Sequence, residues 1–395
     1  MKKIFLTLVF MMIGFPAWAS NFHFESEDGK FSTNLGWRAQ LRFANPGDED
    51  LRTPSHFSDD ETSNFELRRM RMKIGGHGYK PWIKYYFELD LQPSRRSNQD
   101  ETNSTARLID WRIDIQPYEV LAFRVGQWKI NYNRERVDSS GKQQFVERSI
   151  VNRVFNIDRQ VGVLMQGRLD KGGALDTRYY LGVFNGEGRS IDNTNENMMT
   201  MARLQWNLEG KELAWSQSDV ERHKTPHMQI AVAWVGNKGE CTRWSSSGCG
   251  SLDGLTQGTS NQYAIEQFVE EVAYKYNGMS VQHEYHWKEV IDNNTNITYN
   301  YDGSYSQIGY FLDHFIETAP KELEIAFRYA FVNEPDPSNM TLENNRKEYT
   351  LGMNWFVAGH NNKITMDYSH LILNDASDAR SYNDNRVRLQ WDVSF

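Results

Sequence analysis

The sequence predicts an all-β protein, a transmembrane antiparallel β-barrel of about 16 strands, and three observations support this prediction. The last ten residues, Arg386 to Phe395, alternate polar and apolar side chains without interruption, as a strand with one wet and one apolar face does. No apolar run in the sequence reaches the roughly 18 residues that a membrane-spanning helix needs. Aromatic residues nevertheless make up 13% of the chain, which fits aromatic girdles at two membrane interfaces.

The N-terminus has the pattern of a secretory signal peptide, which we assign to residues 1–19. Two lysines form its basic end, an apolar stretch follows from Ile4 to Phe15, and a small-x-small cleavage site ends at Ala19. The apolar stretch is too short for a membrane anchor. We therefore expect residues 20–395 to leave the cytoplasm and to form one β-barrel domain in the outer membrane.

Charge and hydropathy restrict the possible partners. The formal net charge is −8, and loss of the two signal-peptide lysines makes the mature chain still more acidic, which argues against nucleic acid as a partner. The mean hydropathy of −0.69 is compatible with outer-membrane lipid as the surroundings, because only every second residue of a barrel strand faces lipid.

The alternation recurs along the chain in segments of strand length. One phase slip, near Arg68, predicts a β-bulge. Short and long connections alternate, as periplasmic turns and external loops do, and an even number of strands brings both termini to one side. The expected strands are 31–43, 64–78, 83–90, 109–116, 120–129, one that begins at 161–163, 178–184, 202–207, 228–234, 262–276, 279–288, 304–313, 322–332, 349–356, 364–371 and 386–395.

Three intervals between strands lack a clear pattern. Asn131 to Asp158 is the longest in the first half, and a loop of this length in a compact β domain is usually functional or disordered. Lys211 to His223 is polar, and we expect a turn there. Asn237 to Ser260 contains Cys241 and Cys249, which we expect to pair in an oxidising compartment, with two free thiols as the alternative.

Five short segments resemble the phosphate-selective porin O and P family. They are FELRRMR at 65–71, RVGQWK at 124–129, FVERS at 145–149, GVFNGEG at 182–188 and YTLGMNW at 349–355. Each segment is short, but together the five segments follow the order and spacing of the family over most of the mature chain. The resemblance implies a homotrimeric porin of 16 strands that conducts anions, with phosphate or polyphosphate as solutes. It also implies that inward-folded loops narrow the pore and that arginines line it, and we therefore expect Asn131 to Asp158 to be the constriction loop.

Basic residues on the inward phase of the strands, and those in the constriction loop, are the candidate substrate-binding residues. On the inward phase, basic side chains outnumber acidic ones although the whole chain is acidic. Rings of Arg and Lys favour anions, but ladders of Arg facing carboxylates that only solvate the lumen are the alternative reading. The candidates are Arg38, Arg42, Arg69, Arg71, Lys73, Arg112, Arg124, Lys129, Arg134, Arg136 and Arg148.

These observations predict a water-filled channel for passive diffusion of small anions, with phosphate or polyphosphate expected from the resemblance. A general diffusion porin without a phosphate site is the first alternative, and a barrel enzyme is a remote one. His283 and His286 are suggestive, but residues three apart on a strand face opposite sides and do not bind one metal. We expect no enzymatic activity, no cofactor and no metal site.

Overall fold

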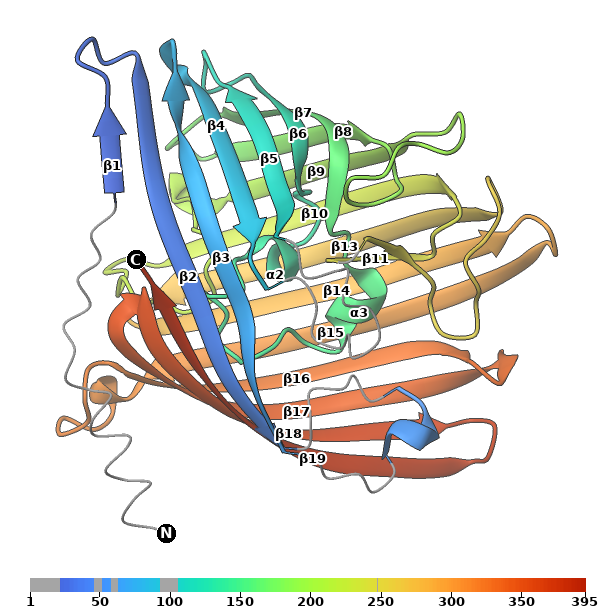
Figure 1. Ribbon diagram of the computed structural model, residues 1–395. Coiled ribbons are helices and arrows are strands. Elements are labelled where there is room, and N and C mark those ends of the chain that lie inside the picture. The colour runs from blue at the N-terminus through green and yellow to red at the C-terminus, as the bar shows by residue number, and fades with distance from the viewer. Residues whose placement is uncertain (1–21, 46–51, 58–62, 93–105, 247) are drawn as a thin grey trace.

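A computed structural model describes residues 22–45, 52–57, 63–92, 106–246 and 248–395 of the chain. The predicted signal peptide lies outside these residues. The described chain forms a closed antiparallel β-barrel that surrounds short helical segments (Figure 1). Among the described residues, no helix is long and apolar enough to cross a membrane.

Sixteen strands form the barrel, which confirms the predicted fold class and strand count. Each strand pairs antiparallel with its neighbour along the chain, and the last barrel strand pairs with the first. The strands are β2 (Phe31–Asn45), β3 (Asn64–Gly78), β4 (Lys80–Asp90), β5 (Arg107–Ile115), β6 (Ala122–Lys129), β7 (Arg159–Leu169), β8 (Thr177–Phe184), β9 (Met199–Asn207), β10 (His227–Gly239), β13 (Tyr263–Tyr276), β14 (Met279–Asp292), β15 (Ile297–Phe311), β16 (Leu323–Asp336), β17 (Asn339–His360), β18 (Asn362–Asp375) and β19 (Arg380–Ser394).

The seam of the barrel joins β19 to β2. Arg388 lies opposite Ala44 and Ser394 opposite Arg38. Beyond this ladder, the short strand β1 (Phe22–Glu25) pairs with the first part of β2 and continues the same edge. Because closure satisfies the backbone N–H and C=O groups of both edge strands, the sheet can reside in lipid.

The phase slip near Arg68 is a β-bulge, as predicted. Gln40 lies opposite Arg69, but the next residue, Leu41, lies opposite Leu67, so Arg68 has no residue across from it in this ladder. The extra residue restores Leu67 to the outward phase.

A second bulge, which the alternation did not reveal, lies at Ile109. Glu88 pairs with Asp110, whereas Leu89 pairs with Leu108. Ile109 is 2% exposed and Leu108 is 41% exposed. An uninterrupted period of two over residues 109–116 predicts that Ile109 faces outward with Trp111. This prediction is wrong, because the extra residue inverts the phase at this end of β5.

Strand length distinguishes two parts of the barrel, which we name the low wall (β4 to β9) and the tall wall (β10 to β19). Strands β4 to β9 have 8–11 residues, whereas the barrel strands from β10 to β19 have 13–22. The predicted alternation of short and long connections fails after β13. There the long strands turn back directly through residues 293–296, 337–338 and 376–379, because extended hairpins replace external loops.

Three connections fold into the lumen. The constriction loop (residues 130–158) carries α2 (Arg134–Val137) and α3 (Val151–Phe155). Residues 240–262 carry the hairpin β11 (Arg243–Ser245) and β12 (Gly248–Gly250). Residues 208–226, which we name the periplasmic insert, begin with the 3₁₀ helix η2 (Leu208–Gly210). Two further 3₁₀ helices are η1 (Pro54–Phe57) and η3 (Leu312–His314).

An apolar core inside the barrel unites these segments. Phe155 of the constriction loop and Trp244 of the β11–β12 hairpin are fully buried in it, together with inward side chains such as Val290 of β14. Inward side chains of the shorter strands also join this core, among them Leu164 of β7 and Phe184 of β8.

Candidate functional site

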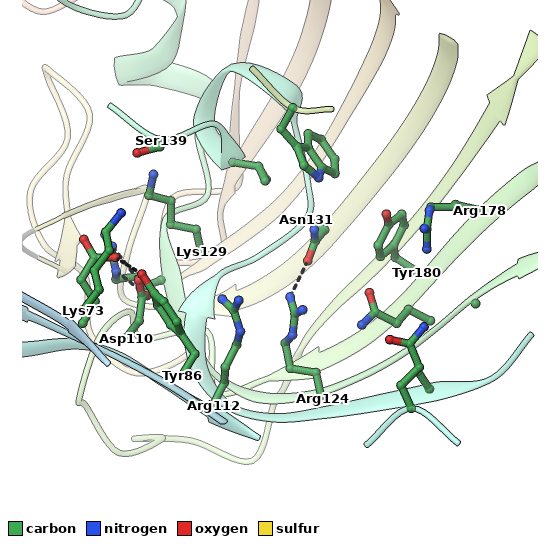
Figure 2. Close-up of a pocket in the computed structure, with 18 of the residues that line it drawn as sticks. Lys73, Tyr86, Asp110, Arg112, Arg124, Lys129, Asn131, Ser139, Arg178 and Tyr180 are labelled. Carbon is green, nitrogen blue, oxygen red and sulfur yellow. Dashed lines mark hydrogen bonds and ion pairs between the residues drawn. The ribbon is translucent and has the colours of Figure 1, made fainter. Parts of the chain in front are cut away.

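A polar cavity of about 510 Å³ lies between the low wall and the constriction loop. Strands β3 to β8 line one side of it, and the constriction loop and the periplasmic insert line the other. Figure 2 shows Arg112 and Arg124 side by side, with their guanidinium groups directed from neighbouring strands into this space. We name this cavity the passage.

Cations outnumber carboxylates in the lining of the passage, with seven basic side chains against three acidic ones. Strand alternation delivers most of them, since inward positions on a strand recur every second residue. The basic residues are Arg71, Lys73, Arg112, Arg124, Lys129, Arg159 and Arg178, and the acidic residues are Glu88, Asp110 and Glu212.

Two of the three carboxylates are paired with an arginine of the wall. Arg71 Nη1 donates to Glu88 Oε1 at 2.8 Å. Arg159 donates to both oxygens of Asp110, at 2.8 and 3.0 Å. A bidentate pair of this kind holds the charges in a fixed geometry and cancels them locally.

The third carboxylate belongs to the periplasmic insert. Glu212 Oε2 accepts hydrogen bonds at 2.9 Å from Arg168 and at 2.9 Å from Arg178. Arg168 also donates to Asp176, at 2.8 and 3.1 Å. Each of the three carboxylates in the lining of this cavity therefore has an arginine partner.

Several cations of the passage have no carboxylate of their own. Among the residues that the structure describes, Lys73 has no carboxylate within ion-pair distance. Lys129 Nζ donates only to backbone carbonyl oxygens, both at 3.2 Å. Arg112 and Arg124 share one carboxylate, Asp114, at 3.2 and 2.5 Å. The passage therefore has a positive excess.

Aromatic rings support the two central arginines. Arg112 lies 4.7 Å from the ring centroid of Tyr86, and Arg124 lies 5.5 Å from that of Trp128. These cation–π contacts help to keep the two guanidinium groups directed into the passage. Tyr180 lies on the far side of Arg124 in Figure 2, beside Arg178.

Six predicted site residues hold the constriction loop instead of lining the passage. Arg38 donates to two serine hydroxyls of the loop at 2.8 and 2.7 Å. Arg42 lies 2.9 Å from Glu147, and Arg69 lies 3.7 Å from the same carboxylate oxygen. All three are strand residues that face inward, as the alternation predicted, but the loop covers them.

The other three belong to the loop itself. Arg134 donates to a backbone carbonyl of the periplasmic insert and to a glutamine of β10. Arg136 forms an ion pair with Asp158. Arg148 donates to the carbonyl oxygens of Glu135 and Asp138 at 2.8 and 2.6 Å. These side chains fix the shape of the loop, so a charge pattern in sequence did not reveal which arginines face the solute.

Carboxylates of the tall wall anchor the loop through its backbone. Glu271 accepts from the N–H of Arg134 at 2.9 Å, and Glu284 accepts from that of Glu135 at 2.6 Å. Asp367 accepts from Val146 N at 2.9 Å in the same way. The sequence suggested that acidic residues of the lumen only balance the charges of arginines. These three carboxylates instead accept hydrogen bonds from buried N–H groups of the loop.

Glu135 itself has an unusual environment within the loop. Its carboxylate accepts from Ser149 N at 2.7 Å and Ser149 Oγ at 2.9 Å. Burial, with the like charge of Glu284 nearby, raises the pKa of Glu135 to about 7, although Arg328 and Arg148 oppose the shift. The loop therefore contains one carboxyl group that titrates near neutral pH.

Two further sequence expectations concern histidines and cysteines. His283 faces outward and bonds Ser306, whereas His286 is 1% exposed inside the barrel, on opposite faces as predicted. Cys241 and Cys249 are joined in a disulfide, with Cα atoms 5.4 Å apart. The disulfide closes the β11–β12 hairpin beside the apolar core.

Sequence reasoning missed several residues of the passage. Tyr86 and Tyr180 follow the inward phase and were identifiable on that ground, but they carry no charge. Arg159 directly follows the unpatterned interval 131–158 and is the first residue of β7. Glu212 and Trp215 belong to the interval 211–223, predicted as a turn, which proved to enter the lumen. No periodicity marks it, because its structure depends on contacts with distant segments.

A closed 16-strand barrel with an inward loop and a charged passage is the architecture of an outer-membrane porin, a channel. Solved structures with this fold include the channel DcaP of Acinetobacter baumannii, which is 13% identical with a TM-score of 0.56 and covers 94% of this chain and 99% of its own. OmpT of Vibrio cholerae is 10% identical with a TM-score of 0.57, covering 95% and 100%. An anion-selective porin from Comamonas acidovorans is 10% identical with a TM-score of 0.56, covering 92% and 100%.

The chain belongs to the phosphate-selective porin O and P family, whose sequence model matches residues 40–395. This confirms the resemblance found in the short motifs and the outer-membrane location. No curated protein sequence matches the chain. At identities this low, the solved structures establish the fold alone.

Proposed function

We propose that this porin carries small anions by passive diffusion, with phosphate or polyphosphate as its principal solutes. One observation carries the proposal: every carboxylate that lines the passage is paired with arginine, whereas Lys73, Lys129 and the Arg112–Arg124 pair retain an excess of positive charge. A pore lined in this way attracts anions and repels cations.

Phosphate suits this lining for a chemical reason. A guanidinium group presents a planar fork that donates to two oxygens at once, and Arg112 and Arg124 present two such forks from adjacent strands. The proposed binding residues in the passage are therefore Arg71, Lys73, Arg112, Arg124 and Lys129. The other six predicted candidates act through the constriction loop.

Processing and assembly complete the proposal. Residues 1–19 are removed as a signal peptide, and residues 20–395 form one barrel domain. The porin assembles as a homotrimer in outer-membrane lipid, which is supported by the trimer form in which OmpT of Vibrio cholerae has been solved. A cross-linked species of three chains in mild detergent is the expected result.

Planar bilayers test the solute. In a potassium chloride gradient, the reversal potential of the purified porin should show chloride preferred over potassium. Added phosphate should then reduce the chloride current in a saturable way, because it occupies Arg112 and Arg124. Chloride preference without phosphate block would favour a general anion-preferring diffusion porin. Potassium preference would refute the proposal.

A further inference from the structure

We propose that Trp215 of the periplasmic insert sets the size limit of the passage, while the arginines of the wall set its charge preference. The inference rests on the proposed anion channel and adds a second, independent filter to it. The sequence offered no hint of such a role, since it assigned this interval to a polar turn.

The insert reaches the passage from the side opposite to the constriction loop. It connects β9 to β10, whereas the loop connects β6 to β7 at the other rim of the barrel. The two segments meet inside the lumen: Gln144 N donates to Gln217 Oε1 at 2.7 Å, and Gln217 Nε2 donates to Gln143 Oε1 at 3.0 Å. The narrowing is thus built from both sides of the membrane.

Further contacts fix the insert to the tall wall. Ser218 Oγ donates to Glu324 Oε2 at 2.9 Å, and Lys275 Nζ donates to the carbonyl oxygen of Ser218 at 2.9 Å. Leu213 is buried, with 3% exposure. The insert is therefore held at several points on either side of Trp215, and it does not move as a free flap.

Trp215 sits at the border between the apolar core and the passage. One part of the indole packs against the core, and another part lines the cavity. Arg134 and Arg203 lie 5.5 and 5.1 Å from its ring centroid. Arg203 is itself fixed by two hydrogen bonds to Glu271, at 2.6 and 2.7 Å. A large, rigid ring held in this way presents a fixed steric boundary.

The indole carries no charge, which separates its role from that of the wall. Both arginines that contact Trp215 keep other partners when the ring is removed, Arg203 with Glu271 and Arg134 with Gln229. A Trp215→Ala change should therefore widen the passage without altering the charges that face it. Pore diameter and lining charge are separate determinants of selectivity.

The test compares Trp215→Ala and Trp215→Phe with Trp206→Ala. Trp206 belongs to β9 and points outward with 42% exposure, so it controls for loss of an indole near the insert. Heat-modifiable migration on a gel establishes that each barrel is folded. Bi-ionic reversal potentials then give the gluconate-to-chloride and chloride-to-potassium permeability ratios.

We expect Trp215→Ala to raise the gluconate-to-chloride ratio by about threefold or more, with the chloride-to-potassium ratio unchanged. The gluconate-to-chloride ratio of Trp215→Phe should lie between those of wild type and Trp215→Ala. The ratio of Trp206→Ala should equal that of wild type. A folded Trp215→Ala porin with the wild-type gluconate-to-chloride ratio would overturn the inference, as would an equal gain in Trp206→Ala. The wild-type chloride-to-potassium ratio tests the proposed anion channel separately.

Discussion

Neutralising the two lysines of the passage that lack a carboxylate should weaken anion selectivity in a predictable way. Lys73 belongs to β3, and Lys129 lies where β6 enters the constriction loop. Glutamine at both positions keeps a hydrogen-bonding side chain of similar length but removes two positive charges. The paired arginines retain their carboxylates, so the local structure has no new unmatched charge.

Coulomb's law gives the size of the effect. A unit charge about 8 Å from a permeating ion, at an effective dielectric constant between about 40 and 80, contributes roughly 0.5–1 kcal/mol. Each lysine is then worth about a 2- to 5-fold change in the permeability of a monovalent anion, and the effect is squared for divalent phosphate. The double variant should lower chloride permeability by roughly 4- to 25-fold. The chloride-to-potassium ratio should fall by at least this factor, because potassium is then repelled less.

Reversal potentials in a tenfold salt gradient measure this ratio directly. Lys347→Gln is the control, because Lys347 lies opposite Phe331 on the outer face and its loss removes a positive charge away from the passage. The control should retain wild-type selectivity. A Lys73→Gln/Lys129→Gln variant within twofold of wild type would refute the reasoning, because selectivity would then arise elsewhere. Higher salt should reduce the difference, since exposed charges are screened.

Three further predictions concern the segments that fill the lumen. A Cβ on Gly352 would lie 2.9 Å from the Phe145 ring, so Gly352→Leu should displace the constriction loop and raise single-channel conductance. Serine at Cys241 and Cys249 removes a cross-link that spans eight residues of sequence; we expect a local loss of about 2–3 kcal/mol, seen as faster proteolysis there with the barrel intact. Because burial raises the pKa of Glu135, the protonated carboxyl stabilises the docked position of the constriction loop. This stabilisation of the loop is complete below about pH 4.5 and is lost as the pH rises through about 7. Conductance should rise across that window in wild type and stay flat in Glu135→Gln.

Much of the barrel is determined by the sequence alone. A strand half in lipid and half in water must alternate with a period of two, so strand number, closure and the bulge at Arg68 could be read from the order of residues. The inward direction of Lys73, Arg112 and Arg124 follows from the same period. The bulge at Ile109 was not visible in the sequence, because Leu108 and Ile109 are both apolar and either of them fits the outward position.

The passage itself is a product of the tertiary structure. Which arginines face a solute depends on where the constriction loop and the periplasmic insert lie, and these segments have no periodicity that predicts their course. Arg134 and Arg136 carry the same charge as Arg124, but the fold buries them against the insert and Asp158.

Local sequence therefore determined the wall of this channel, because each strand residue must satisfy only lipid on one side and the lumen on the other. Only the assembled fold decided the width and charge of the opening, because Trp215, Gln217 and the wall carboxylates act through contacts with residues far away in the chain. Alternation is a property of neighbours, whereas pairing across a lumen is a property of the closed barrel.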